Sequence, residues 1–229
     1  MTPNLVWPAV ASAVSAIIDW IGVATRRARI EYGAKPAAIL FLIVWILLAV
    51  PPATAWRLPC ALVLAALALS LVGDILLMLP SAQFIAGLVV FLLAHLAYIL
   101  AFNWGRGLPG AAQGLVAAGV AIVLVLIMPP VRAGLRRAGR AALVVPVAAY
   151  AVTLGGMLWS ALGTLLQPSW LAHGAWWIAF GGLAFFASDV SLVWDRFVGP
   201  IPGRRVTTHM LYHAAQLALT GGVMVSLAG

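Results

Sequence analysis

Two neighbouring apolar stretches decide the fold of this chain: Ser70-Leu-Val-Gly-Asp-Ile-Leu-Leu-Met-Leu-Pro80 and Phe84-Ile-Ala-Gly-Leu-Val-Val-Phe-Leu-Leu-Ala-His-Leu-Ala-Tyr98. The first contains one carboxylate, Asp74, and the second contains His95 and Tyr98. An unpaired ionised side chain at the centre of a membrane-spanning helix costs roughly 2.5 to 3.5 kcal/mol on insertion scales. Polar groups that are kept at this cost are candidate functional groups.

The composition is that of an integral membrane protein. Of the 229 residues, 65% are hydrophobic and 8% are charged, and the mean hydropathy is +1.11, far above the range of soluble globular proteins. A spanning helix needs about 20 apolar residues, and apolar segments occupy nearly the whole length. We therefore expect an all-α polytopic helix bundle that forms one domain over residues 1–229.

Eight apolar segments have the length of membrane spans. Proline and glycine separate several of them, at Pro51–Pro52, Pro80, Pro129–Pro130 and 200–203, because proline interrupts the hydrogen-bond ladder of a helix. The predicted spans are residues 5–23, 36–56, 58–79, 82–103, 110–128, 141–163, 170–194 and 206–227. With eight spans, both chain ends are expected on the same side of the membrane.

The basic residues predict the orientation in the membrane. Eleven of the 13 Lys and Arg residues fall in or beside the first, fifth and seventh loops, and only Arg57 and Arg106 fall on the other side. By the positive-inside rule these three loops face the cytoplasm and both termini face outward, as expected in a bacterial inner membrane. The net charge of +8 is thus interpreted as a topology signal and not as a nucleic-acid surface.

Most of the intramembrane polar residues gather at one depth. At about 1.5 Å per helical residue, they lie within about 10 Å of the cytoplasmic ends of their spans. They are Asp74, Asp189, His209, Tyr212 and His213. His95 lies about 20 Å along its own span, so we expect it at the deeper floor of a cavity that opens toward the cytoplasm. Asp74 and Asp189 are the predicted functional pair.

Helical spacing places further polar and aromatic residues on the same inward faces. These are Ser70, Phe84, Phe91, His95, Tyr98, Phe185, Ser188 and Gln216. A milder polar stripe on the sixth span, which includes Tyr150, is interpreted as helix packing. Asp19, Glu31 and Asp195 lie near arginines at the membrane interface and are interpreted as solvated or paired charges.

The residues leave two other functions open. His209 and His213 have the i, i+4 spacing that lets two imidazoles bind one metal ion. Together with His95 and an aspartate they would form the zinc site of a ceramidase-type lipid hydrolase. Alternatively, buried Asp and His residues relay protons in proton-coupled transporters of small solutes or lipids, although the sequence has no duplicated halves.

The order and spacing of these residues resemble the YhhN-type lysoplasmalogenase family of membrane enzymes. The matching motifs are Lys35-Pro36, Gly73-Asp74, Leu79-Pro80, Phe84-x-x-Gly87, His95-x-x-Tyr98, Ser188-Asp189 and Tyr212-His-Ala-Ala-Gln216. The resemblance covers residues 35–229, so residues 1–34 would be an extra N-terminal helix and basic loop. It implies hydrolysis of the vinyl-ether bond of lysoplasmenylcholine or lysoplasmenylethanolamine to a fatty aldehyde and a glycerophospho head group, without a metal or organic cofactor.

Vinyl-ether hydrolysis needs an acid that protonates carbon, and an anionic or basic group that stabilises the oxocarbenium ion and directs water. We predict Asp74 as the acid and Asp189 as the partner that orients water, with the reverse assignment open. The expected substrate-binding residues are His95, Tyr98, Ser188, Tyr212, His213, Gln216 and Lys35, with Phe84, Phe91 and Phe185 along the alkenyl chain. Arg204 and Arg205 would hold the phosphate or only set the topology. The expected partners are the lysophospholipid substrate and membrane lipids.

Overall fold

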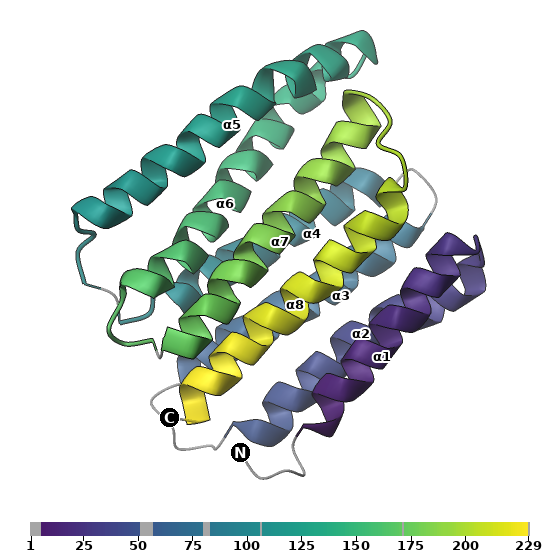
Figure 1. Cartoon of the computed structure of the whole chain (residues 1–229). Coiled ribbons are helices and arrows are strands. Elements are labelled where there is room, and N and C mark those ends of the chain that lie inside the picture. The colour runs from purple at the N-terminus through teal and green to yellow at the C-terminus, as the bar shows by residue number, and fades with distance from the viewer. Residues whose placement is uncertain (1–5, 51–56, 80–82, 106, 171, 229) are drawn as a thin grey trace.

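The computed structural model describes residues 6–50, 57–79, 83–105, 107–170 and 172–228. In this part of the chain, eight helices are long and apolar enough to cross a membrane, and there is no strand (Figure 1). They are α1 (Trp7–Ala24), α2 (Ala28–Ala49), α3 (Arg57–Met78), α4 (Phe84–Phe102), α5 (Ala111–Arg137), α6 (Val144–Gly163), α7 (Ala172–Phe197) and α8 (Arg204–Ala228). The predicted all-α membrane bundle is confirmed. Pro51–Pro52, Pro80 and Arg106 lie outside the described residues.

Most successive helices pack against each other as antiparallel neighbours, whereas α4 packs against α3 and α6. The most extensive contacts join α7 with α8, α3 with α4 and α1 with α2, and α8 also touches α1, α2 and α3. In Figure 1, α5 lies at one edge of the bundle and the α1–α2 hairpin lies at the other. The helix α1 begins and α8 ends at the same end of the bundle, and the α1–α2, α5–α6 and α7–α8 turns lie at the opposite end.

Glycines allow the closest hairpins to form. A Cβ atom on Gly174 of α7 would lie 2.6 Å from the carbonyl oxygen of Gly222 on α8, and one on Gly73 of α3 would lie 2.7 Å from the ring of Phe91 on α4. Small residues at such positions let helix backbones approach closely in a membrane, where dispersion contacts hold helices together. The second contact fixes the position of Asp74, the residue after Gly73.

Two helices run through prolines that were expected to bound their spans. The helix α2 begins at Ala28, not at residue 36, and contains Pro36; α5 continues through Pro129–Pro130 to Arg137. A proline inside a helix costs about 3 kcal/mol, and burial on the same helix offsets this cost, because Val131 and Leu135 of α5 are fully packed. Lys35 and several arginines assigned to loops are therefore helical residues.

Candidate functional site

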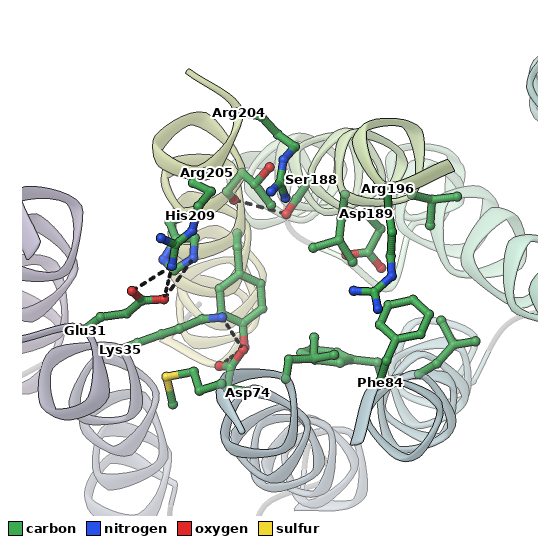
Figure 2. A pocket seen from close by; sticks show the side chains of 18 of the residues that line it. Glu31, Lys35, Asp74, Phe84, Ser188, Asp189, Arg196, Arg204, Arg205 and His209 are labelled. Atoms are coloured by element: carbon green, nitrogen blue, oxygen red, sulfur yellow. Dashed lines mark hydrogen bonds and ion pairs between the residues drawn. The ribbon is translucent and has the colours of Figure 1, made fainter. Parts of the chain in front are cut away.

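A pocket of about 230 Å³ opens between α2, α3, α4, α7 and α8, at the end of the bundle that carries the α7–α8 turn (Figure 2). Seven of the predicted site residues line it: Lys35, Asp74, Phe84, Phe91, Ser188, Asp189 and Tyr212. The lining also includes Glu31, Tyr150, Arg196, Arg204, Arg205 and His209. The pocket therefore combines a mixed-charge rim with two aspartates deeper inside.

Asp74 is enclosed by charged and polar partners. Lys35 Nζ lies 2.9 Å from Asp74 Oδ1 as an ion pair, and the Tyr212 hydroxyl donates a 2.6 Å hydrogen bond to Oδ2. Gln216 Nε2 donates to the Tyr212 oxygen at 3.3 Å, and the Tyr98 hydroxyl donates to Gln216 Oε1. Tyr98 and Gln216 are fully buried and do not line the pocket, so they position Tyr212 from behind.

Asp189 has a separate set of partners. The Tyr150 hydroxyl donates to Asp189 Oδ2, and His95 Nε2 lies 3.1 Å from the same oxygen and 3.1 Å from the Tyr150 oxygen. His95 Nδ1 is buried and has no hydrogen-bond partner among the described residues. In a neutral His95 the proton therefore belongs on Nε2, where it can be donated to Asp189.

The contact between His95 and Asp189 corrects the expectation that His95 forms a separate, deeper floor. The imidazole reaches Asp189 because it lies on the inward face of α4 and packs against Phe185, with ring centroids 4.8 Å apart. The predicted depths of His95 and Asp189 were counted along the helix backbones alone. The two side chains extend toward each other and bridge the difference in depth.

The two aspartates differ in exposure. The Asp74 side chain is 1% exposed, and Lys35 and Tyr212 hold its two oxygens. The Asp189 side chain is 14% exposed, and both of its partners among the described residues contact Oδ2. Asp189 Oδ1 thus remains available to a bound molecule. The predicted pair shares one pocket, but each carboxylate belongs to its own hydrogen-bond network.

The rim holds three arginines in different environments. Arg205 donates two 2.9 Å hydrogen bonds to Glu31, and Arg204 Nε lies 2.7 Å from Asp195 Oδ2. These contacts agree with the interpretation of Glu31 and Asp195 as paired charges. The Arg196 guanidinium lies 3.9 Å above the Phe84 ring centroid and has no carboxylate within ion-pair distance in the described part of the chain. Figure 2 shows it turned over the pocket beside Phe84.

Asp19 is a paired charge, as expected, but its partner is a histidine and it is not solvated. It is completely buried, and His209 Nδ1 lies 2.7 Å from its Oδ2. The neighbouring Trp20 donates to His213 Nδ1 at 3.1 Å. His213 therefore faces α1 and does not line the pocket, in contrast to its expected contact with substrate. The arginines that follow Asp19 in the sequence suggested an arginine partner. In the structure, Asp19 lies on the face of α1 that packs against α8.

The arrangement separates His95 from the other two histidines of the zinc alternative. His95 contacts Asp189 and Tyr150, whereas His209 and His213 face Asp19. Over the described ranges, no group of three or more His, Cys, Asp and Glu side chains could hold a metal ion.

Sequence reasoning missed two important pocket residues. Tyr150 was assigned to packing, although its stripe on the sixth span already marked it as inward-facing. Arg196 was counted as topology charge, although it lies seven residues, two helical turns, after Asp189 and therefore on the same face of α7. Ser188, by contrast, lines the pocket as expected, and its hydroxyl donates to the carbonyl of Thr208 at 3.1 Å.

Comparisons with known proteins place these residues in a wider context. The YhhN family profile matches residues 30–223. Human lysoplasmalogenase TMEM86B is 33% identical over 156 residues, which cover 68% of this chain and 60% of that protein. The rat protein of the same name is 35% identical over 188 residues, which cover 81% of this chain and 69% of that protein.

A bacterial relative shows a similar degree of identity. The lysoplasmalogenase of Mycobacterium tuberculosis is 35% identical over 164 residues, which cover 69% of this chain and 58% of that protein. The chain thus spans about three fifths of the length of the human and mycobacterial relatives. No solved structure matches it.

Proposed function

Because the chain belongs to the YhhN family, we propose that it is a membrane enzyme that hydrolyses the vinyl-ether bond of lysoplasmalogens. Its mammalian and mycobacterial relatives bear the name lysoplasmalogenase. The observation that carries the proposal is the pocket in which Asp74 and Asp189 face one space from two distinct networks. The products are a fatty aldehyde and the glycerophospho head group.

The pocket suits an amphiphile that enters from a bilayer. Its charged rim lies at the end of the helices, and its two aspartates lie further in, among residues of membrane-spanning segments. A lysoplasmalogen would place its head group at the rim and its vinyl ether beside the aspartates. The basic turns at this end favour a cytoplasmic orientation by the positive-inside rule.

Arg196 is the cation at the rim that supports phosphate binding best. Arg204 and Arg205 are each neutralised by a carboxylate, and Lys35 is paired with Asp74. The Arg196 guanidinium lies over the Phe84 ring at 3.9 Å and near the Phe197 ring at 6.0 Å. These cation–π contacts hold the guanidinium in place and leave its N–H donors free of carboxylates among the described residues. A phosphate oxygen would complete its hydrogen bonding.

The ion pair with Lys35 supports the reverse of the predicted roles of the two aspartates. An ammonium group 2.9 Å from a carboxylate favours the ionised form of that carboxylate, which suits Asp74 to stabilise a cation rather than to donate a proton. Asp189, in its protonated form, would carry the proton on Oδ1. The hydrogen-bond donors at Oδ2 stabilise the carboxylate that remains after proton transfer.

The reaction then follows in balanced steps. Asp189 transfers its proton to the vinyl carbon that is not bound to oxygen, and the other vinyl carbon becomes an oxocarbenium ion near the Asp74 carboxylate. Water attacks this carbon and gives up a proton to Asp189, which restores the acid and yields a hemiacetal. The hemiacetal loses the glycerol oxygen as an alcohol and becomes the aldehyde. One carboxylate acting as acid and then as base resembles the cycle of retaining glycosidases.

A lysolipid panel tests this function directly. Purified protein in detergent is incubated with lysoplasmenylethanolamine and lysoplasmenylcholine, and with acyl and saturated alkyl lysolipids that have the same head groups. Fatty aldehyde from the vinyl ethers alone is the expected result. Fatty acid release from the acyl lipid, or activity that a chelator abolishes and zinc restores, would overturn the proposal in favour of a metal-dependent lipid hydrolase. A substrate flux in liposomes without hydrolysis would favour a transporter.

A further inference from the structure

A second, apolar groove lies between α5, α6 and α7. Its walls include Leu124, Ile127 and Val131 of α5, Ala151 of α6 and Val193 of α7. Its volume of about 30 Å³ is much smaller than the volume of the polar pocket, about 230 Å³. No charged side chain lines it except Asp189.

Two close helix contacts bound this groove. Near the end of the bundle that carries the α5–α6 turn, a Cβ on Gly134 of α5 would lie 1.7 Å from the Phe197 carbonyl oxygen, so α5 and α7 touch there. Further along α5, Leu124 Cδ1 lies 2.7 Å from the Cβ position of Gly155 on α6. Figure 1 shows α5 standing at the edge of the bundle, next to α6. The groove is the gap that these contacts leave.

The groove and the polar pocket meet at the candidate acid. Tyr150, Asp189 and Val193 line both spaces. On one side of Asp189 lie Lys35, Asp74 and the charged rim, and on the other side lie only apolar walls and the Tyr150 ring. A molecule that reaches across Asp189 would have a charged part in the pocket and a hydrocarbon part in the groove.

The surroundings of the groove favour an occupant from the bilayer. Val125 and Leu126, which neighbour the groove residues of α5, are 69% and 70% exposed. In a membrane-spanning helix such side chains face lipid. The groove therefore adjoins the hydrocarbon layer, and an alkyl chain can occupy it without leaving an apolar environment.

We propose that this groove holds the part of the lipid's hydrocarbon chain next to the vinyl ether. The inference rests on the proposed function. In a lysoplasmalogen the vinyl ether joins the polar glycerol part to the chain, and Asp189 joins the polar pocket to the groove in the same order.

This placement replaces the expectation that Phe84, Phe91 and Phe185 line the path of the chain. Phe84 and Phe91 line the polar pocket, and Phe84 lies beneath Arg196. Phe185 is completely buried and packs edge-on against His95 and Tyr212. These aromatic rings build the wall and the core behind the site.

Filling the groove tests the inference. Ala151→Phe places a ring in the groove, and Val152→Phe places the same ring on the neighbouring residue, which is 67% exposed. Hydrolysis is measured with a long-chain vinyl ether and with a short-chain one of the same head group, which has no carbon beyond the vinyl group and therefore leaves the groove empty. Ala151→Phe is expected to lower kcat/KM for the long chain about tenfold relative to the short one, the equivalent of roughly two methylene groups that lose their burial. Val152→Phe should leave the ratio unchanged; equal ratios in both variants would overturn the inference.

Crosslinking of the unmodified protein gives a second test that does not depend on turnover or on the folding of a variant. A lysophosphatidylethanolamine with a diazirine near the start of its chain is photolysed with the protein, with and without excess unlabelled lysolipid. Competable labels in peptides that contain 124–131 or 147–154 are expected. Competable labels confined to α3 and α4 would contradict the groove. If the lipid probe labels the groove of the wild-type protein but the protein releases no aldehyde, the proposed reaction is wrong and the groove is still a binding site for the hydrocarbon chain.

Discussion

Lys35 of α2 and Asp74 of α3 form an ion pair, with 2.9 Å between Nζ and Oδ1, and their side chains are only 11% and 1% exposed. The Lys35 ammonium also lies 5.1 Å from the centroid of the Tyr212 ring, whose hydroxyl holds the other oxygen of Asp74. These two partners offset the free-energy cost of placing the Asp74 carboxylate in a membrane-spanning segment. The proposed roles of the two aspartates rest on the difference in their partners.

The ion pair predicts a characteristic double-mutant result. Lys35→Met or Asp74→Asn alone leaves one buried partner behind, and breaking a buried pair in this way typically costs about 3 to 5 kcal/mol. The double variant removes both charges, so its melting temperature in detergent should recover toward that of the wild type while aldehyde release stays lost. If the melting temperatures of the two single variants were unchanged, the ion pair would have no structural role.

Arg196 should affect substrates that carry a phosphate. Arg196→Met is expected to raise the KM for lysoplasmenylethanolamine about tenfold or more, because a hydrogen bond to a charged group contributes about 1.5 to 3 kcal/mol. The KM for alkenylglycerol, which lacks the phosphate, should change little. Arg137→Met, on the exposed end of α5, is the matched control. Equal increases for both substrates would show that Arg196 does not recognise phosphate.

Tyr150 should assist the acid. Tyr150→Phe removes one of the two donors to Asp189 Oδ2, so kcat is expected to fall roughly 10- to 100-fold, with little change in KM. Tyr32→Phe is the control, because the exposed Tyr32 hydroxyl only reaches the Met78 carbonyl at 3.4 Å. A full-rate Tyr150→Phe enzyme would remove Tyr150 from the mechanism.

Helix α1 should contribute to the stability of the site although it lies outside the residues that the family profile matches. Asp19→Asn weakens the charge-assisted contact with His209, a pocket residue. The expected result is a lower melting temperature, and the KM should rise more than kcat falls, because the rim moves while the aspartates stay in place. An unchanged melting temperature and unchanged kinetics would show that α1 is only a peripheral anchor.

Much of the fold could be predicted from hydropathy because membrane spans follow from composition alone. The start of α2 and the end of α5 could not be predicted in this way. Lys35, Val131 and Leu135 are buried against other helices, and this burial outweighs the local helix-breaking effect of proline. Tertiary packing decides whether a proline ends a helix or lies within it.

The candidate site was predicted less completely. The helical spacing predicted that Asp74, Asp189 and Tyr212 face one cavity, and all three line the pocket. Helical spacing does not predict which side chains on different helices contact each other. Only the structure shows that Lys35 pairs with Asp74 and that His95 contacts Asp189. The different environments of the two carboxylates follow from those partners.

Aldehyde release by Asp189→Asn is the most direct measurement of the central claim. Purified wild type, Asp189→Asn and Asp195→Asn are compared on lysoplasmenylethanolamine, with melting temperatures recorded to confirm folding. Asp195 lies on the same helix but outside the pocket lining, where it pairs with Arg204. Loss of the acid should lower kcat by about 10²- to 10⁴-fold in Asp189→Asn, while Asp195→Asn keeps most of its activity. A folded Asp189→Asn protein with undiminished turnover would contradict the account.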